Sequence, residues 1–197
     1  MPLNLQTDVR DSISPKISRE WIERARALKP LLEASAGDIE QSRSIPAHVL
    51  DALHAAQMFR TVMPRSVGGA ELDPATHAQV VATIAEGDAS VAWCIAQAAC
   101  ASMACAYLEP HAAREIFEDA RAVFTFGFTR GEPPCLAVPA EGGWIINGTW
   151  TFASGNRCAT WLGGHCRLCD ENGNQLKHPD GRPFPARPRR SMSRAGM

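Results

Sequence analysis

A run of twenty residues without a charged side chain, from Ala89 to Leu108, constrains the fold more than any other part of the sequence. Asp88 or Ser90 can cap a helix at its start, and Pro110 lies just beyond its end. The run is apolar all the way round a helix, which predicts a buried central helix. Its length also matches a membrane span. We favour a core helix because the run is built from Ala, Cys and Ser, contains Gln97 and lacks a basic flank.

Apolar residues at helical spacing predict that further helices pack around this run. The expected segments begin near Arg19, with Ser18 as cap and Pro30 as a local bend or end, then run from Pro46 to near Met58, from Ala75 to Glu86 and from Pro110 to about Ala120. Each of these segments has an apolar face that needs a partner. The N-terminal part is therefore expected to be an all-α domain.

The hydrophobic period changes after residue 122. Residues 123–129 are mostly β-branched or aromatic and form too short a run for a helix, so strands are expected to begin there. Further strands are expected at Leu136–Pro139, Trp144–Asn147, Thr149–Ala153 and Thr160–Leu168. The pair Asn147-Gly148 is a typical hairpin turn signal. The predicted fold class is α+β, with a helical domain followed by the beginning of a β domain.

The end of the chain is rich in Pro and Arg, and no acidic residue follows Asp180. Such a composition cannot bury a core, which predicts a disordered basic tail. The few strands before the tail leave unpaired edges, so the chain is expected to be the N-terminal part of a longer protein. The expected division is a loose N-terminus (1–18), a helical domain (19–121), a partial β domain (122–181) and the tail (182–197).

Charge and cysteine usage exclude several classes of protein. With 20 basic and 21 acidic residues, the formal net charge of -1 gives no global field that would attract nucleic acid or a membrane surface. The number of cysteines, seven, is odd, and Cys94, Cys100 and Cys105 lie in the apolar run, where they are expected to be small buried hydrophobes. The N-terminus shows no secretory signal. We expect a cytoplasmic protein that binds neither nucleic acid nor membrane.

Three motifs follow one another along the chain. They are Met-Pro-Arg-Ser-Val-Gly-Gly at 63–69, Glu-Gly-Asp-Ala-Ser-Val-Ala-Trp at 86–93 and Gly-Trp-Ile-Ile-Asn-Gly-Thr-Trp at 143–150. In order and spacing they resemble the acyl-CoA dehydrogenase superfamily, over about residues 19–178. The segment Trp-Thr-Phe-Ala-Ser-Gly at 150–155 is more similar to its branch of flavin-dependent monooxygenases, which hydroxylate aromatic or polycyclic substrates with reduced flavin from a separate reductase.

The resemblance implies a helical N-terminal domain, a small β-barrel middle domain and a C-terminal four-helix bundle. In such proteins a flavin, either FMN or FAD, lies between the last two domains of a homotetramer. This chain would supply the first domain and an incomplete β-barrel, and the bundle would be missing. The implied partners are a small-molecule substrate and a flavin reductase. Two other interpretations stay open: an acyl-CoA dehydrogenase that oxidises a CH–CH bond with FAD, and an inactive remnant with only an interaction role.

The same resemblance implies cofactor-binding residues. Ser154 matches a hydroxyl residue beside the reactive edge of the flavin ring, and Phe152 matches an aromatic residue that covers the ring. Gly155 would let the backbone come close. Phe128 and Thr129 match positions against the flavin pyrimidine.

Two tryptophans, Trp150 and Trp161, would wall the dry pocket that oxygen chemistry needs. After Thr129 the family pattern is replaced by residues 130–134, which argues against acyl-CoA as substrate. No catalytic residue is assigned within this chain.

Each of these residues also has a purely structural interpretation. Ser154-Gly155 is ordinary turn chemistry, Thr129 is a typical strand residue, and the tryptophans can fill a core with their indole N–H groups bonded at its rim. Cys166 and Cys169 have the right chemistry for zinc, but a single Cys-x-x-Cys is a weak signal. No metal site is therefore expected.

Overall fold

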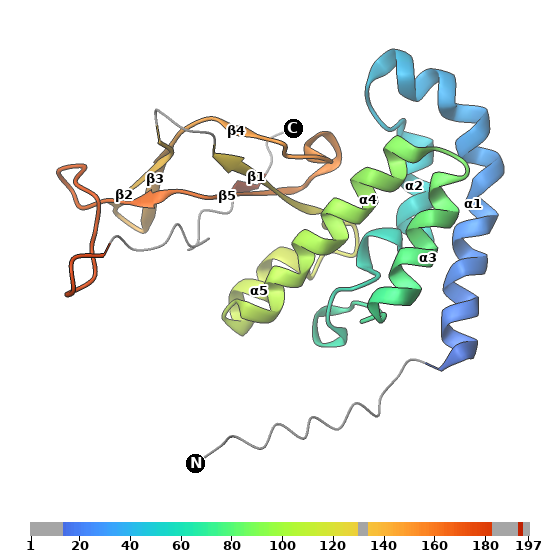
Figure 1. The fold of residues 1–197 in the computed structure, drawn as a ribbon, viewed down its shortest axis with the longest axis horizontal. Helices are drawn as coiled ribbons and strands as arrows, with labels where there is room; N and C mark the ends of the chain where they lie inside the picture. Colours follow the sequence, from blue (N-terminus) through green and yellow to red (C-terminus); the bar gives the residue numbers. More distant parts are fainter. Residues whose placement is uncertain (1–13, 130–133, 183–192, 195–197) are drawn as a thin grey trace.

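The computed structural model describes residues 14–129, 134–182 and 193–194, in which helices lie at one end of the molecule and strands at the other (Figure 1). The helices are α1 (Pro15–Ser42), α2 (Ala47–Ala55), α3 (Pro74–Ala85), α4 (Ala89–Ser102) and α5 (Pro110–Phe117). Short 3-10 turns are η1 (Met58–Arg60), η2 (Arg65–Val67), η3 (Met103–Tyr107) and η4 (Asn156–Cys158). The strands are β1 (Phe124–Thr129), β2 (Leu136–Ala140), β3 (Gly143–Asn147), β4 (Trp150–Thr151), β5 (Trp161–Gly164), β6 (Arg167–Leu168) and β7 (Ser193–Arg194). The helical domain and the α+β class are confirmed.

Helix α1 begins earlier than the sequence pattern indicates. The side chain of Ser14 caps it by accepting from the Lys16 N–H at 3.4 Å, and Pro15 occupies the first turn, where a missing N–H costs nothing. Ser18 is not the cap; its hydroxyl instead bonds that of Thr76 on α3 at 2.8 Å. Pro30 lies inside the helix without ending it, and α1 has buried residues on both sides of it, from Trp21 to Ile39.

The other helices lie where they were expected, with shifted ends. Helix α2 ends at Ala55, before Met58, and Pro46 is its cap residue. Helix α3 begins at Pro74, because the carboxylate of Asp73 accepts from the Ala75 and Thr76 N–H groups at 3.0 Å each. Helix α5 ends at Phe117, three residues before the expected limit.

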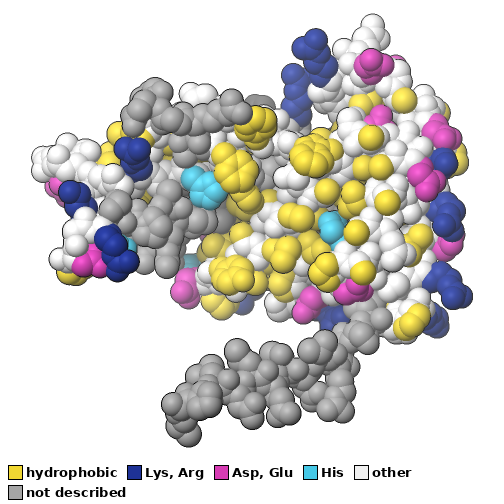
Figure 2. Space-filling view, viewed as in Figure 1, with side chains coloured by type: hydrophobic (Ala, Val, Ile, Leu, Met, Phe, Trp, Pro, Cys, Tyr) yellow, Lys and Arg dark blue, Asp and Glu magenta, His cyan; other side chains and the backbone are white. Residues whose placement is uncertain are grey.

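Helix α4 is buried on one side only. Asp88 caps it by accepting from the Val91 N–H at 2.8 Å, and the buried face packs on α3 and β1. Trp93 on the other side of α4 is 58% exposed, and Met103 and Tyr107 of the following η3 are 49% and 91% exposed. Burial all the way round is therefore wrong, because α-helical geometry ends at Ser102 and neighbouring elements cover only one face. Figure 2 shows hydrophobic side chains, in yellow, gathered over this region.

Residues 89–107 satisfy the length and hydropathy expected of a membrane span, with a mean hydropathy of 1.5 over the most apolar window. Slightly under half of that window is buried inside the protein. The core helix of a globular protein meets the same criterion, so this helix is weak evidence for a membrane segment.

Two small sheets make up the β part among the described residues. One has the order β4-β1-β5-β7 and the other β3-β2-β6. Strand β1 runs antiparallel to β4 and parallel to β5, and β2 is antiparallel to β3 and parallel to β6. The segment expected as one strand over 160–168 is thus divided between two sheets. That these sheets belong to a β-barrel stays a prediction.

The hairpin turn lies at a different place from the expected one. The ladder of β2 and β3 closes from Ala140 to Gly143, and Gly142 has a φ of 75° there. Asn147-Gly148 instead connects β3 to β4, which are in different sheets, and neither residue has the positive φ of a type I′ turn. A Cβ on Gly148 would lie 2.3 Å from the Cys135 sulfur, so close packing explains this glycine.

Among the described residues there are three hydrophobic cores, and two of them join the helices to the chain that follows them. The largest contains residues from α1 to α4 and Val123, with Cys158 packed against it. The second joins α5 and the end of α4 to Phe124, with Trp161 at its edge. The third lies within the β part and contains Cys135, Ala137, Cys166 and Leu168.

Part of the expected tail takes part in a sheet. Ser193–Arg194 form β7, which pairs antiparallel with β5. At these two residues the structure differs from the expectation of an unpaired tail. Residues 1–13, 183–192 and 195–197 lie outside the described part of the chain.

Candidate functional site

The candidate site is built where the N-terminal half of α4 meets the loop after β4. Trp93 donates from its indole Nε1 to the hydroxyl oxygen of Ser154 at 2.9 Å, across 61 positions of sequence. Trp93 sits on the outer face of α4 because Val91, Ala92 and Ile95, at 0–2% exposure, fix the rotation of the helix. The predicted hydroxyl residue is thus held by a residue that the sequence did not single out.

The loop that carries Ser154 has a defined backbone. Strand β4 ends at Thr151, and Phe152 then takes a φ of 57°, which is rare for an aromatic residue. Gly155 has a φ of 81° and opens η4, where the Cys158 N–H donates to its carbonyl at 3.1 Å. The left-handed conformation at residue 155 requires glycine, since a side chain there would be strained.

Two predicted cofactor residues present aromatic rings at the surface. Phe152 is 65% exposed and Phe128 is 49% exposed. Phe128 pairs in register with Thr151, so it lies beside the loop of Phe152. Its ring contacts those of Phe126 and His165, with centroids 5.5 Å away in each case. His165, which directly precedes Cys166 in the chain, is therefore part of this aromatic group.

The two predicted pocket tryptophans are half-buried and pack against the cores. Trp150 donates from its indole to the His165 carbonyl at 3.0 Å and packs against the third core. Trp161, on β5, packs against the second core. Trp150 therefore agrees with the purely structural interpretation, in which the tryptophan packs on a core and its indole N–H is hydrogen-bonded at the rim of that core. Thr129 ends β1 and pairs with Trp150.

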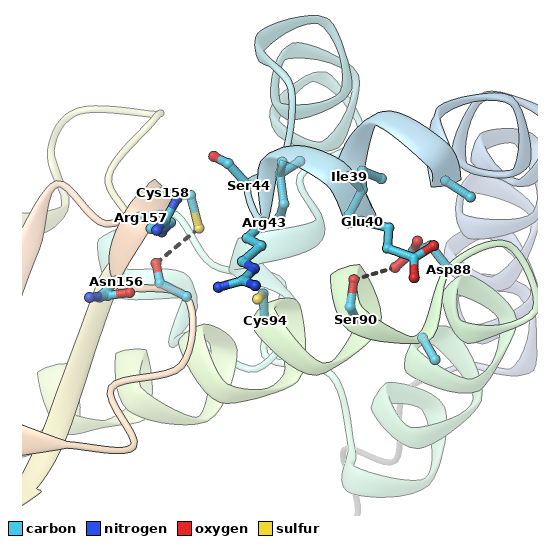
Figure 3. Close-up of a pocket in the computed structure, with 14 residues that line it drawn as sticks. Ile39, Glu40, Arg43, Ser44, Asp88, Ser90, Cys94, Asn156, Arg157 and Cys158 are labelled. Carbon is cyan, nitrogen blue, oxygen red and sulfur yellow. Dashed lines mark hydrogen bonds between the residues drawn. The ribbon is translucent and has the colours of Figure 1, made fainter.

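A pocket of about 590 Å³ lies behind this loop, between the end of α1, the start of α4 and η4 (Figure 3). Among the predicted site residues only Gly155 lines it. Its charged groups are of both signs, from Glu40, Arg43, Asp88 and Arg157. The aromatic surface around Ser154, rather than this pocket, holds the predicted chemistry.

The pocket also contains two thiols, and both are protonated at neutral pH. Burial raises the pKa of Cys158 to about 12, and the neighbouring Cys94 raises it further. Burial likewise raises the pKa of Cys94. Because the thiolate is the reactive form, neither residue is suited to act as a nucleophile.

Within residues 14–129, 134–182 and 193–194, no group of three or more His, Cys, Asp or Glu side chains is placed to hold a metal ion. Cys166 and Cys169 are buried at 3% and 1% exposure in the third core or beside it. What the site offers is one oriented hydroxyl, a glycine and exposed aromatic rings. This set suits a planar aromatic ligand with polar atoms at its edge.

Residues 19–116 match the family described as acyl-CoA dehydrogenase, N-terminal domain, and this part of the chain belongs to that family. The matched segment covers most of α1, all of α2 to α4 and most of α5. The resemblance inferred from the three motifs is confirmed.

Named relatives narrow the similarity to flavin-dependent monooxygenases. The chain is 30% identical over 147 residues to indole-3-acetate monooxygenase of Pseudomonas putida, covering 74% of this chain and 36% of that protein. It is 28% identical over 148 residues to the oxygenase subunit HsaA, a flavin-dependent monooxygenase of Rhodococcus jostii (strain RHA1), covering 73% and 37%. The chain thus spans little more than a third of these relatives.

A solved structure supports the fold. XiaF from Streptomyces sp., in complex with FADH2 and glycerol, superimposes with a TM-score of 0.76 at 22% identity. The match covers 82% of this chain and 40% of XiaF. The helical domain and the small sheets therefore occur together in a protein of this architecture.

Proposed function

We propose that this chain forms the helical domain and one wall of the flavin site of a monooxygenase that hydroxylates an aromatic or polycyclic substrate. The observation that carries the proposal is the Ser154 hydroxyl, held by Trp93 at 2.9 Å beside exposed aromatic rings. Reduced flavin, when bound, supplies the electrons that activate O2, so that one oxygen atom enters the substrate and the other leaves as water. The names of the two relatives support this class of reaction.

The residues present fit a flavin ring. Such a ring is planar and apolar on its faces, with hydrogen-bonding atoms along its edge. Phe152 and Phe128, 65% and 49% exposed, offer apolar cover, and Ser154 offers a hydroxyl to the edge. Gly155 allows close approach of the backbone because it carries no side chain. We assign these four residues and Thr129 to cofactor binding, with either FMN or FAD.

Trp150 and Trp161 remain our candidates for the wall of the substrate pocket. Both are half-buried, so each presents part of its ring at the surface of a core. Their role would be to exclude water from the reacting groups, which strengthens polar interactions there. We assign no general acid or base to this chain.

The proposed site is one-sided, and we propose that segments outside this chain complete it. The exposed surface of α4 and η3, with Trp93, Met103 and Tyr107, is rich in apolar side chains. A C-terminal four-helix bundle would cover this surface. The complete protein would be a cytoplasmic homotetramer, and a separate reductase would supply its reduced flavin. The chain spans only 36% of the first relative, which leaves room for such a bundle. The same proposal includes the domain division: a helical domain over 19–121, a partial β-barrel over 122–181 and a basic tail from 182.

Flavin binding tests the proposal directly. FMN and FAD, each titrated with the purified chain, are expected to show quenched and shifted fluorescence. Ser154→Ala should weaken binding roughly two- to tenfold, because one neutral hydrogen bond is lost. Ser66→Ala, at an exposed serine on η2, is the matched control and should bind as the native chain does. Unchanged flavin fluorescence at high micromolar protein would refute the proposed function.

A further inference from the structure

The direction of the hydrogen bond between Trp93 and Ser154 is fixed by chemistry. An indole N–H can only donate, so the Ser154 oxygen is the acceptor at 2.9 Å. The hydroxyl proton of Ser154 then points elsewhere and is available to a second partner. Among the described residues, no other hydrogen bond of Ser154 is found. A hydroxyl that accepts one hydrogen bond also becomes a stronger donor in the next.

Both partners are held by their own backbone. The Asp88 cap and the buried residues Val91 and Ile95 fix the start and the rotation of α4, and with them the outward direction of Trp93. On the other side, the Asn156 N–H donates to the Ala153 carbonyl at 3.1 Å, which closes the turn around Ser154. The bond therefore joins two frameworks that are already ordered, and it selects one orientation of a hydroxyl that would otherwise rotate.

Exposed aromatic side chains adjoin this hydroxyl. Trp93, which bonds it, is 58% exposed, and Phe152, two residues before it in the chain, is 65% exposed. Once a ligand has displaced water from this surface, the hydroxyl needs a hydrogen-bond acceptor on the ligand, because an unpaired polar group in an apolar site is costly. An aromatic ring system with a carbonyl oxygen or an imine-type nitrogen at its edge meets this requirement.

We propose that Trp93 is a positioning residue, which sets the Ser154 hydroxyl as a hydrogen-bond donor to an acceptor atom at the edge of the bound flavin ring. This inference rests on the proposed function, because it takes flavin as the ligand. Oxidised flavin presents acceptors at N5 and at the C4 carbonyl, so it is the suitable probe. Trp93 acts through Ser154, and its own ring need not touch the edge that Ser154 recognises.

A double-mutant cycle with oxidised FMN separates this role from a general one. Trp93→Phe keeps an aromatic ring and removes the donor; it should weaken FMN binding roughly two- to tenfold. In a Ser154→Ala background the same substitution should have no further effect, and the shift of the flavin absorption band should be the same in Ser154→Ala and in the double variant. Trp144→Phe, at a half-buried tryptophan of β3 in the third core, is the matched control and should bind normally.

The bond itself is tested without flavin. In NMR spectra, the indole N–H signal that disappears in Trp93→Phe should move in Ser154→Ala, whereas the Trp150 signal, bonded to the His165 carbonyl, should stay. An unmoved Trp93 signal would overturn the proposal, as would equal weakening of FMN binding by Trp93→Phe in both backgrounds. If the Trp93 signal moves in Ser154→Ala but no variant binds FMN, the hydrogen bond exists and flavin is not the ligand. That result would overturn the proposed function, and it is distinguishable from failure of the hydrogen bond.

Discussion

At the scale of single residues, Thr125 stands out because its hydroxyl has no partner. The side chain is 1% exposed, and its Oγ1 finds no hydrogen bond among the described residues. Thr125 lies on β1 beneath the candidate site, where a Cβ on Gly155 would come within 3.4 Å of its methyl group. A buried hydroxyl without a partner costs stability relative to a methyl group of the same shape.

Thr125→Val is therefore expected to stabilise the protein by about 1 kcal/mol, measured as the free energy of unfolding in urea. Thr160→Val is the matched control with the opposite sign, since the Thr160 hydroxyl accepts from the Val123 N–H at 3.0 Å. That substitution should destabilise by a similar amount. A loss of stability in Thr125→Val would show that the hydroxyl has a partner, such as a buried water.

Histidine at position 77 makes stability depend on pH. Burial lowers the pKa of His77, whose Nδ1 lies 3.0 Å from the Thr61 hydroxyl. Below the unfolded pKa of about 6.5 the unfolded chain takes up a proton that the folded chain resists, so stability falls as pH drops from 7 to 5. Urea unfolding at several pH values should show a smaller slope in His77→Gln. Equal slopes in the native protein and in His77→Gln would contradict this assignment.

The candidate site shows what residue-level patterns can predict. Ser154, Phe152 and Phe128 were found because they occur in a short contiguous motif or in a strand next to it. Trp93 was quoted only as part of a helix motif, because its bond to Ser154 spans 61 positions and no local pattern encodes such a contact. Whether these residues bind flavin stays a prediction.

At the scale of elements, Arg60 joins three segments of the helical domain. It is 7% exposed and donates to the carbonyls of Ala120, Val67, Gly68, Phe117 and Asp119 at 2.5–3.4 Å. These carbonyls belong to η2, to the end of α5 and to the loop before β1. Orphan carbonyls at a helix end need such donors, so one guanidinium takes the place of several backbone partners.

Arg60→Ala is expected to lower the free energy of unfolding by about 3 kcal/mol, because buried carbonyls lose a charged donor. Arg60→Lys should recover only part of this loss, since an ammonium group cannot reach the same spread of oxygens. Chemical denaturation of both variants measures the difference. Arg65→Ala, at an exposed arginine of η2, is the control, and an Arg60→Ala protein as stable as this control would disprove the role.

Element positions could be predicted well, and element pairing could not. Capping residues and apolar spacing found every helix, but the start of α1, its continuation through Pro30 and the end of α4 at Ser102 were not predicted. The Asn147-Gly148 signal failed because a turn motif says nothing about which strands pair, and here Cys135 packing determines the glycine. The exposed face of α4 was missed because periodicity reports the polarity of a helix, whereas burial depends on which neighbours are present.

At the scale of the whole molecule, the helical and β parts are not independent bodies. Val123 is 1% exposed in the first core, and Phe124 is 3% exposed in the second, although both follow the last helix. Strand β1 packs against α4. The third core, in contrast, contains only residues of the β part, among them Leu168. The boundary of cooperative unfolding is therefore expected to lie within the β part and not at the end of the helices.

Two core substitutions test where the boundary of cooperative unfolding lies. Val123→Ala is expected to destabilise the helices and the β1-β5 sheet together, by about 2 kcal/mol, because it leaves a cavity in a shared core. Leu168→Ala removes more apolar volume, yet it should chiefly loosen the sheet of β2, β3 and β6, since local regions with their own contacts open separately. Hydrogen exchange followed by mass spectrometry measures both outcomes. Val123→Ala should speed exchange in α3, α4 and β1 alike. Leu168→Ala should speed exchange in residues 136–147 while α3 and α4 stay protected. Faster exchange of α4 in Leu168→Ala would mean that all three cores unfold as one unit, and unchanged exchange of α4 in Val123→Ala would mean that the helices are stable without the strands.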